Sequence, residues 1–337
     1  MSFASIADFE RALADLPQPD EAAIAAARAR QAQLTKPAAS LGRLEEIAIY
    51  FAGWQRRERP AIARGKAVVF AGNHGVTVHG VSAFPATVTA QMVANFRAGG
   101  AAINALAKAA GLELGVVPIA LENPTADFTG GPAMREDECL AALSIGAAAV
   151  DGDLELLVAG EMGIGNSTAA AALCARSFGG GAAAWVGPGT GVDAEGVSRK
   201  AAIVERTLAH HAQAPGTAFE TLRRVGGRET AAIAGAVLRA RQLRIPVLLD
   251  GFISCASIAP LAANCPDIIA HCLAGHCSAE PGHGRLLEKL GLDPLLQLGM
   301  RLGEGSGAAV AANIIRSALA AHGKMATFAE AGVSGAE

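Results

Sequence analysis

Short apolar runs alternate with segments of helical composition through the middle of the chain. The apolar runs predict buried parallel strands and cover residues 67–71, 114–121, 154–159, 182–186, 245–249 and 267–270. Most of them are separated by segments that predict helices, at residues 88–110, 168–176, 199–213 and 230–241. This alternation predicts an α/β fold, a doubly wound parallel sheet with helices on both faces. Such sheets bind ligands beyond the carboxyl ends of their strands, so the loops after the strands are the candidate site.

Both ends of the chain have helical patterns. Residues 6–34 place Leu, Ile and Ala on one face, and a further apolar stripe follows at residues 44–51. Pro37 is expected to end the first helix, and Ser40 is a candidate cap for the second. Towards the other end, Ser306 is a candidate N-cap for an Ala-rich helix.

Composition and charge narrow the class of protein. The chain has 337 residues, of which 51% are hydrophobic and 18% charged, enough for a large folded core. A formal net charge of −3, only 4% aromatic residues and no Lys/Arg stripe argue against nucleic acid as a partner. The Ala-rich runs are interrupted before membrane-spanning length, so we expect no membrane association. Scattered cysteines without a CxxC pair, and a first segment unlike a secretory signal, predict a cytoplasmic protein.

The loops that follow the predicted strands are rich in Gly, Ser, Thr and Asn. Residues 160–168 and 187–191 are of this kind, and residues 250–252 follow a third strand. This composition suits a cradle for phosphate and ribose at the starts of helices. None has the Gly-Lys-Ser/Thr of a P-loop or the spacing of a dinucleotide fingerprint. Each loop taken singly could be a plain connection between strand and helix, but together they favour a nucleotide-type ligand.

The segment at residues 301–307 carries the candidate catalytic group. Glu304 lies between Gly303 and Gly305, so backbone can approach a ligand from either side. A helix that begins near Ser306 would direct N–H groups at an anion, and the neighbouring carboxylate could act as a base. The alternative is a glycine-rich turn in which Glu304 only complements the helix dipole.

Histidines and cysteines gather at residues 271–283. Their spacing matches no common tetrahedral zinc pattern, so we expect no metal, and instead buried thiols with histidines on the surface. His74 and His79 lie near a strand end without a Ser or Cys arranged as a nucleophile. We expect no cofactor.

Motifs that run from near the N-terminus to the C-terminal helix are similar, in the same order, to those of one family. They are KPAASLGRLE (36–45), GNHGV (72–76), VSAFPATVTAQMVANFRAGGAAIN (81–104), GEMGIGNSTAAAAL (160–173), VGPGTGVDAEGVSRK (186–200), VLLDGF (247–252), SAEPGH (278–283) and RLGEGSGAA (301–309). On these motifs the chain resembles the nicotinate-nucleotide–dimethylbenzimidazole phosphoribosyltransferases of cobalamin biosynthesis. The set is far more specific than any single glycine-rich loop.

The resemblance implies a fold, an assembly and an activity. It implies a homodimer with a helical segment of a small domain at residues 1–60, a large Rossmann-like α/β domain at 61–300, and the active-site loop and C-terminal helix at 301–337, packing partly with the small domain. The family transfers the phosphoribosyl group of nicotinate mononucleotide to 5,6-dimethylbenzimidazole with inversion. The products are α-ribazole 5′-phosphate and nicotinate.

The same resemblance assigns residues to the site. Glu304 corresponds to the catalytic base, and the other residues are expected to bind substrate. These are Glu161, Gly163, Gly165, Asn166, Ser167, Gly189, Thr190, Gly191, Lys200, Asp250, Leu302, Gly303, Gly305, Ser306, Gly307, Phe84, Met92, Lys36 and Arg43. Lys36, Arg43 and Lys200 are candidates for the phosphate and the nicotinate carboxylate. For Lys36 and Arg43 the alternative is a connection between helices with solvated charges.

The chemistry of the reaction agrees with one isolated carboxylate. A pyridinium leaving group departs as a neutral ring nitrogen, so it needs no general acid. The benzimidazole loses a proton from one nitrogen as the other attacks, so a single base suffices. A glycosidase would instead need a pair of carboxylates.

The chain also departs from the family pattern. Asn73 stands where many members have Asp, and Pro188 stands where Arg is frequent, which weakens an anion contact there. Phe84 and Met92 fall where some members have Ser and Gln, and they predict a preference for dimethylbenzimidazole over hydroxylated bases. The alternatives are a non-catalytic nucleotide-binding regulator and a transferase that uses another phosphoribosyl donor or base. Phosphoribosyl pyrophosphate is the less favoured donor because Asp250 has no acidic neighbour for magnesium.

Overall fold

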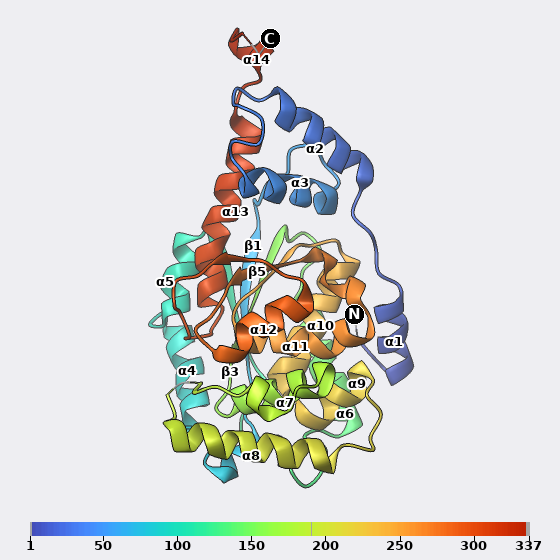
Figure 1. Cartoon of the computed structure of the whole chain (residues 1–337), viewed down its shortest axis with the longest axis vertical. Helices are drawn as coiled ribbons and strands as arrows, with labels where there is room; N and C mark the ends of the chain where they lie inside the picture. The colour runs from blue at the N-terminus through green and yellow to red at the C-terminus, as the bar shows by residue number, and fades with distance from the viewer. Residues whose placement is uncertain (1, 190, 335–337) are drawn as a thin grey trace.

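A parallel sheet forms the centre of the molecule (Figure 1). The computed structural model describes residues 2–189 and 191–334. The strands in this part of the chain are β1 (Gly65–Ala71), β2 (Leu112–Pro118), β3 (Leu156–Met162), β4 (Val247–Leu249), β5 (Cys272–His276) and β6 (Pro294–Leu296). They form a 6-stranded sheet in the order β2-β1-β3-β4-β5-β6, with every neighbouring pair parallel. The predicted parallel α/β sheet is confirmed.

Successive residues of the central strands are buried on opposite faces of the sheet. Val68 and Phe70 of β1 belong to one apolar core, whereas Ala67 and Val69 belong to a second core on the other face. Because both faces are covered, these strands are continuous apolar runs and not alternating ones.

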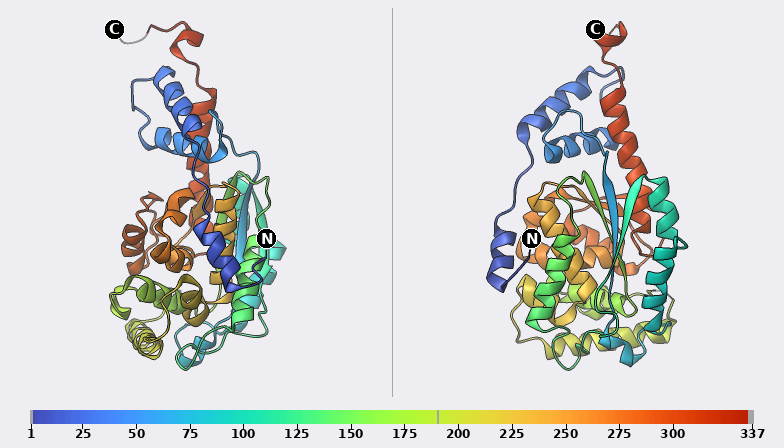
Figure 2. Two further views of the ribbon diagram at one scale, coloured as in Figure 1. Left: turned by 90° about the vertical axis from the view of Figure 1, so that its right-hand side faces the viewer. Right: turned by 180° about the vertical axis from the view of Figure 1, so that it is seen from behind.

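Helices cover both faces of the sheet (Figures 1 and 2). The α-helices of the described residues are α1 (Ile6–Ala14), α2 (Glu21–Gln33), α3 (Arg43–Gln55), α4 (Thr87–Ala98), α5 (Ala102–Ala109), α6 (Glu136–Ala148), α7 (Asn166–Phe178), α8 (Ala194–His210), α9 (Ala218–Val225), α10 (Arg228–Gln242), α11 (Phe252–Asn264), α12 (Pro281–Leu290), α13 (Ser306–Lys324) and α14 (Phe328–Ala331). The short 3-10 helices are η1 (Gly75–His79), η2 (Ala182–Ala184) and η3 (Pro266–His271). Helices α10 and α11 contact one face, and α5 and α13 contact the other, which confirms the doubly wound arrangement.

Two of the predicted strands are wrong, and the strands β5 and β6 were not predicted. Residues 182–186 form η2 and its end, where an Ala-rich stretch with a single β-branched residue has little strand propensity. Residues 267–270 lie in η3, which starts with Pro266, and the strand β5 begins only afterwards. The short strand β6 begins at a proline and lies at the sheet edge, so its sequence carries a weak signal.

Several predicted helix boundaries are also wrong. The segment 6–34 contains α1 and α2, which are separated at Pro17 and Pro19 because proline interrupts the helical hydrogen bonds. The segment 88–110 contains α4 and α5, and Gly99 ends the first of them in the left-handed region with φ of 82°. Ser40 caps no helix, because α3 starts at Arg43 after a turn at Gly42.

The first three helices of the chain pack in two different places. Phe9 and Leu13 of α1 are buried in the core of the sheet domain, next to Phe219. In contrast, α2 and α3 pack together beside the far half of α13 (Figures 1 and 2). Arg30 of α2 joins these helices by donating hydrogen bonds to the backbone carbonyls of His322 (2.8 Å) and Met325 (2.9 Å). The domain boundaries at residues 60 and 300 stay a prediction.

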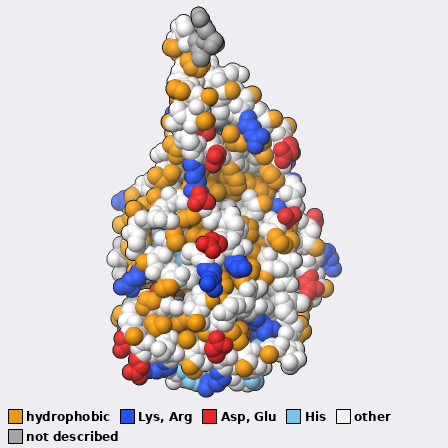
Figure 3. Space-filling model, in the orientation of Figure 1, with side chains coloured by type: hydrophobic (Ala, Val, Ile, Leu, Met, Phe, Trp, Pro, Cys, Tyr) orange, Lys and Arg blue, Asp and Glu red, His pale blue; other side chains and the backbone are white. Residues whose placement is uncertain are grey.

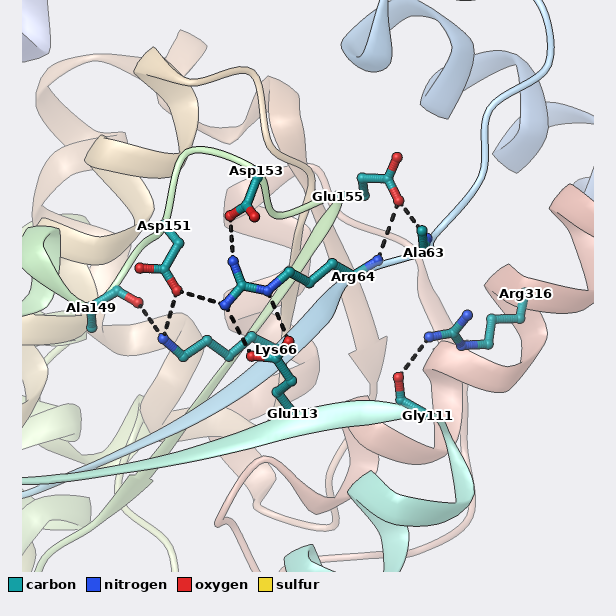
Figure 4. A network of polar contacts seen from close by, with 10 residues as sticks. All are labelled: Ala63, Arg64, Lys66, Gly111, Glu113, Ala149, Asp151, Asp153, Glu155 and Arg316. Atoms are coloured by element: carbon teal, nitrogen blue, oxygen red, sulfur yellow. Dashed lines mark hydrogen bonds and ion pairs between the residues drawn. The ribbon is translucent and has the colours of Figure 1, made fainter.

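A network of ion pairs lies at the amino ends of β1, β2 and β3 (Figure 4). The guanidinium of Arg64 donates to Glu113 (2.8 and 3.1 Å) and to Asp151 (3.2 Å). Lys66 donates to the same Asp151 (3.1 Å) and to the carbonyl of Ala149 (3.1 Å). Every carboxylate named here therefore has a cationic partner.

Charged side chains of both signs are spread over the face that Figure 3 shows. Lys and Arg side chains are interspersed with Asp and Glu there, and no broad basic patch forms. Among the residues described, no helix combines the length and the apolar character that crossing a bilayer requires.

Candidate active site

A cavity of about 690 Å³, counted with the space open to solvent, lies at the carboxyl ends of the strands. Its walls come from the loops after β3, β4 and β5, from the loops before α4 and α8, and from the turn before α13. The lining residues are Val81, Ser82, Glu161, Gly163, Ile164, Gly165, Asn166, Ser167, Pro188, Gly189, Val192, Lys200, Gly251, Phe252, Ile253, His276, Ser278, Glu280, Arg301, Leu302 and Gly303. Strand order reverses between β1 and β3, so the cavity lies where open α/β sheets bind their ligands.

Many of the predicted site residues meet in this cavity. The structure brings together Glu161, Gly163, Gly165, Asn166, Ser167, Gly189, Lys200, Leu302 and Gly303. Thr190 lies outside the described residues, and the neighbouring Gly191 is exposed and does not line the cavity.

A cationic group forms one side of the cavity. Lys200 projects from α8, is 1% exposed, and donates to Ser167 Oγ (2.9 Å) and to the carbonyl of Gly187 (2.8 Å). Burial lowers the pKa of Lys200 to about 8, and the charge of Glu280 opposes this change. Arg301 lies at the same side and donates to the carbonyl of Gly189 (3.2 Å). Lys200, Arg301 and the start of α7 can therefore hold an anionic group.

Glu280 shares this side of the cavity. Its Oε1 atom is buried and has no hydrogen-bond partner among the described residues. Burial raises the pKa of Glu280, and the ammonium of Lys200 opposes this rise. The opposite charges of Lys200 and Glu280 therefore act on one another at this side of the cavity.

A buried carboxylate forms another side of the cavity. Glu161 is the next-to-last residue of β3, is 6% exposed, and accepts a hydrogen bond from the side-chain amide of Asn166. Burial, followed by the charges of Asp250 and Glu229, raises the pKa of Glu161 to about 8. This carboxyl group can therefore hold a proton near neutral pH.

Glu304 is buried in a turn with an uncommon backbone conformation. Its φ is 65°, between Gly303 at 84° and Gly305 at 86°. A non-glycine residue in this region carries strain, which is typical of functional turns. The turn also passes so close to β3 that a Cβ atom at Gly160 would lie 2.4 Å from the Glu304 carbonyl oxygen.

The carboxyl group of Glu304 lies next to the start of α5 and does not itself line the cavity. It is 5% exposed, and its Oε2 atom has no hydrogen-bond partner among the described residues. Burial raises the pKa of Glu304; the backbone N–H of Ile103 opposes this rise and the charge of Asp250 adds to it. The Oε2 atom of this buried carboxyl group is therefore free to accept a proton from a ligand that enters beside Gly303.

Asp250 is hydrogen-bonded to the backbone at the Glu304 turn and does not line the cavity. It is 1% exposed and accepts hydrogen bonds from the backbone N–H groups of Gly305 (3.2 Å) and Ala308 (2.9 Å). Asp250 was expected to contact substrate directly. In the structure it contacts protein backbone at the start of α13 instead. Ser306 is the first residue of this helix and not its N-cap; its hydroxyl donates to the carbonyl of Gly303 (2.6 Å).

The remaining predicted residues lie outside the cavity lining. Lys36 pairs with Glu45 (2.8 Å), and Arg43 pairs with Asp293 (2.6 Å), so within one chain both cations are bound to protein groups. Phe84 is 48% exposed and lies two residues after Ser82, which lines the cavity. The other residues outside the lining are Met92, which packs against the second core, and Gly305, Ser306 and Gly307, which belong to the turn and first residues of α13.

Sequence reasoning missed several lining side chains. Ser82, His276, Ser278, Glu280 and Arg301 all line the cavity but were not assigned to it. Ser278 and Glu280 lie in a quoted family motif directly after β5, so the position after a strand was the available signal.

The histidines of the 271–283 segment are buried, which corrects the expectation of surface positions. His271, His276 and His283 are each at most 2% exposed. The two ring nitrogens of His271 lie 3.0 Å from the carbonyls of Val237 and Ile268. Burial lowers the pKa of His271 to about 3, so the neutral ring donates to one of the two carbonyls. Among the described residues, no group of His, Cys, Asp and Glu side chains is placed to hold a metal ion.

Comparison with known proteins gives a consistent result over almost the whole chain. A phosphoribosyltransferase family model matches residues 16–333. The nicotinate-nucleotide–dimethylbenzimidazole phosphoribosyltransferase of Novosphingobium aromaticivorans is 71% identical over 332 residues, 98% of both chains. The protein of the same name from Cereibacter sphaeroides is 56% identical over 98% of both chains.

Solved structures agree with these sequence relationships. The crystal structure of CobT from Thermus thermophilus superimposes with a TM-score of 0.88 and 43% identity, covering 94% of this chain and 100% of that chain. The chain therefore belongs to the phosphoribosyltransferase family that contains the nicotinate-nucleotide–dimethylbenzimidazole phosphoribosyltransferases.

Proposed function

We propose that this chain is the enzyme that transfers the phosphoribosyl group of nicotinate mononucleotide to 5,6-dimethylbenzimidazole with inversion. The bond between ribose C1′ and the pyridine nitrogen breaks, and a bond from C1′ to a benzimidazole nitrogen forms on the opposite face. Nicotinate and α-ribazole 5′-phosphate are the products. The activity in the names of relatives that cover 98% of this chain supports the proposal.

The observation that carries the mechanism is the buried carboxyl group of Glu304, whose Oε2 atom has no hydrogen-bond partner among the described residues. In its ionised form it accepts the proton that the benzimidazole loses from its second nitrogen during attack. The raised pKa of Glu304, caused by burial, makes it a stronger base than an exposed carboxylate. The strained turn and the Asp250 contacts hold this group in one place, so little reorganisation is needed.

The opposite side of the cavity suits the anionic donor. Lys200 and the start of α7 are the groups we assign to the phosphate, with Ser167 as a further hydrogen-bond partner. Arg301 is available to the nicotinate carboxylate. The homodimer that the resemblance implies is part of the same proposal, and sizing by light scattering tests it.

The test is to incubate the purified protein with nicotinate mononucleotide and dimethylbenzimidazole and to follow nicotinate release. Nuclear magnetic resonance of the nucleotide product reports the configuration at C1′. We expect release that depends on both substrates and an α product. Release of nicotinate without dimethylbenzimidazole, or a β product, would contradict the mechanism, and tight nucleotide binding without turnover would favour the regulator.

A further inference from the structure

A buried imidazole–carboxyl pair lies directly behind the cavity wall. His74 follows β1, and Glu229 is the second residue of α10; both are 0% exposed. His74 Nε2 and Glu229 Oε1 are 2.6 Å apart. The second polar atom of each side chain, His74 Nδ1 and Glu229 Oε2, has no hydrogen-bond partner among the described residues.

The pair packs against the backbone of the loop that follows β3. A Cβ atom at Gly163 would lie 3.3 Å from Glu229 Oε1 and 3.3 Å from the Asn166 amide nitrogen. A Cβ atom at Gly165 would lie 3.3 Å from the Cβ of His74. Because Gly163, Gly165 and Asn166 line the cavity, the pair supports the inner wall of the site from behind.

Burying these two side chains costs free energy that apolar residues of similar size would not. The chain leaves room for them, since a Cβ atom at Gly227 would lie 2.2 Å from His74 Cε1. The position also coincides with the reversal of strand order between β1 and β3. A role in the active site therefore explains this buried polar pair better than a contribution to the stability of the fold.

The pair also determines the charge that the cavity carboxylate faces. The charge of Glu229 is among the causes that raise the pKa of Glu161, after burial and Asp250 and ahead of Glu304. The acidic groups around Glu161 are thus Glu229 from α10, Asp250 after β4 and Glu304 before α13. His74 is the side chain that pairs with Glu229, so the pair lies beside this group of acidic side chains.

We propose that His74 and Glu229 form a positioning pair for the active site, which fixes the wall at Gly163–Asn166 and sets the charge next to Glu161. The inference rests on the proposed function. Neither side chain lines the cavity, so the pair acts through Asn166 and Glu161 and not on the substrate. A change in the pair should therefore alter turnover and its pH dependence.

The test compares Glu229→Gln and His74→Gln with a matched control, His271→Gln. His271 is equally buried, but its ring nitrogens face the backbone carbonyls of Val237 and Ile268, away from the cavity lining. The readouts are kcat, KM, the pH profile of kcat/KM and the melting temperature. Glu229→Gln replaces one carboxylate oxygen by an amide nitrogen, so this variant still tests the pair if His74→Gln fails to fold.

We expect both variants of the pair to lower kcat/KM about tenfold, as loss of precise positioning does. Glu229→Gln also removes a charge that raises the pKa of Glu161, so the step of the pH profile that follows Glu161 should move to lower pH by about one unit. His271→Gln should lower only the melting temperature. A Glu229→Gln profile that superimposes on the wild-type profile overturns the positioning role, whereas a wild-type enzyme that releases no nicotinate overturns the proposed function.

Discussion

The pKa values of carboxyl groups are shifted in opposite directions at the two ends of the sheet. At the amino ends of the strands, Glu113 and Asp151 are paired with Arg64 and Lys66, and these pairs lower the pKa values of both carboxyl groups (Figure 4). At the carboxyl ends, burial raises the pKa values of Glu161 and Glu304, and neither has an Arg or Lys partner among the described residues. Paired exposed charges contribute modestly to stability, whereas unpaired buried carboxyl groups are typical of functional sites.

The largest effect should come from removing the charge of Glu304. Glu304→Gln should keep binding of nicotinate mononucleotide but lower kcat about 10²–10⁴-fold, because a general base is lost. Steady-state kinetics and calorimetric binding measure the two quantities. Glu113→Gln is the matched control at the amino end and should retain full turnover; equal losses in both variants would remove the distinction between the two ends.

A smaller loss should follow from Asp250→Asn. The amide places an NH₂ group against one of two backbone N–H donors, so the Glu304 turn loses a fixed acceptor. We expect kcat/KM to fall about 100-fold through misplacement of Glu304, and the free energy of unfolding to fall by about 1–3 kcal/mol. Asp20→Asn changes the comparable N-cap of α2, far along the chain from the cavity, and should leave kcat/KM unchanged.

The pH dependence of stability should differ between the two ends. The folded-state pKa of Glu161, about 8, lies above its ordinary value of 4.5, so the folded state binds this proton more tightly. The associated stability is complete below pH 4.5 and is lost as the pH rises towards 8, by at most about 1.4 kcal/mol per pH unit. Urea unfolding of Glu161→Gln between pH 5 and 8 should give a flatter curve than the wild type. Identical slopes would show that Glu161 does not hold the proton.

The smallest effect should come from the amino-end network. Arg64→Met should lower the melting temperature by only about 2 °C and leave kcat unchanged, because exposed ion pairs contribute little. Thermal unfolding at low and high salt measures the melting temperature, and the difference in melting temperature between variant and wild type should shrink as salt is added. A large loss of activity would mean that the network also shapes the cavity.

The sequence predicted the parts of the fold that depend on local pattern. Long apolar runs such as the one at β1 give a clear signal, and the loops after strands gave the location of the cavity. The Ala-rich segment at η2 and the edge strand β6 carry no clear sequence signal, because their conformation depends on packing against other segments. The resemblance to the family motifs indicated Glu161 and Lys200, but not their hydrogen-bond partners Asn166 and Ser167.

Residues whose role depends on distant segments could not be predicted. The ring of His271 is buried beside the carbonyl of Val237, which lies on another helix. Asp250 was expected at the substrate, yet its acceptors are used by backbone N–H groups more than fifty residues later in the chain. His276 and Glu280 line the cavity because separate loops converge there, which no spacing in the sequence reveals.

The most direct test of the account is whether the contribution of Glu304 depends on a proton in the nucleophile. The rates of wild type and Glu304→Gln can be compared with dimethylbenzimidazole and with its N-methylated form, which has no N–H proton to lose. We predict that Glu304→Gln is slower than wild type by about 10²–10⁴-fold with dimethylbenzimidazole and equally fast with the N-methylated base. An equal loss with both bases would contradict the assignment of Glu304 as the group that accepts the proton.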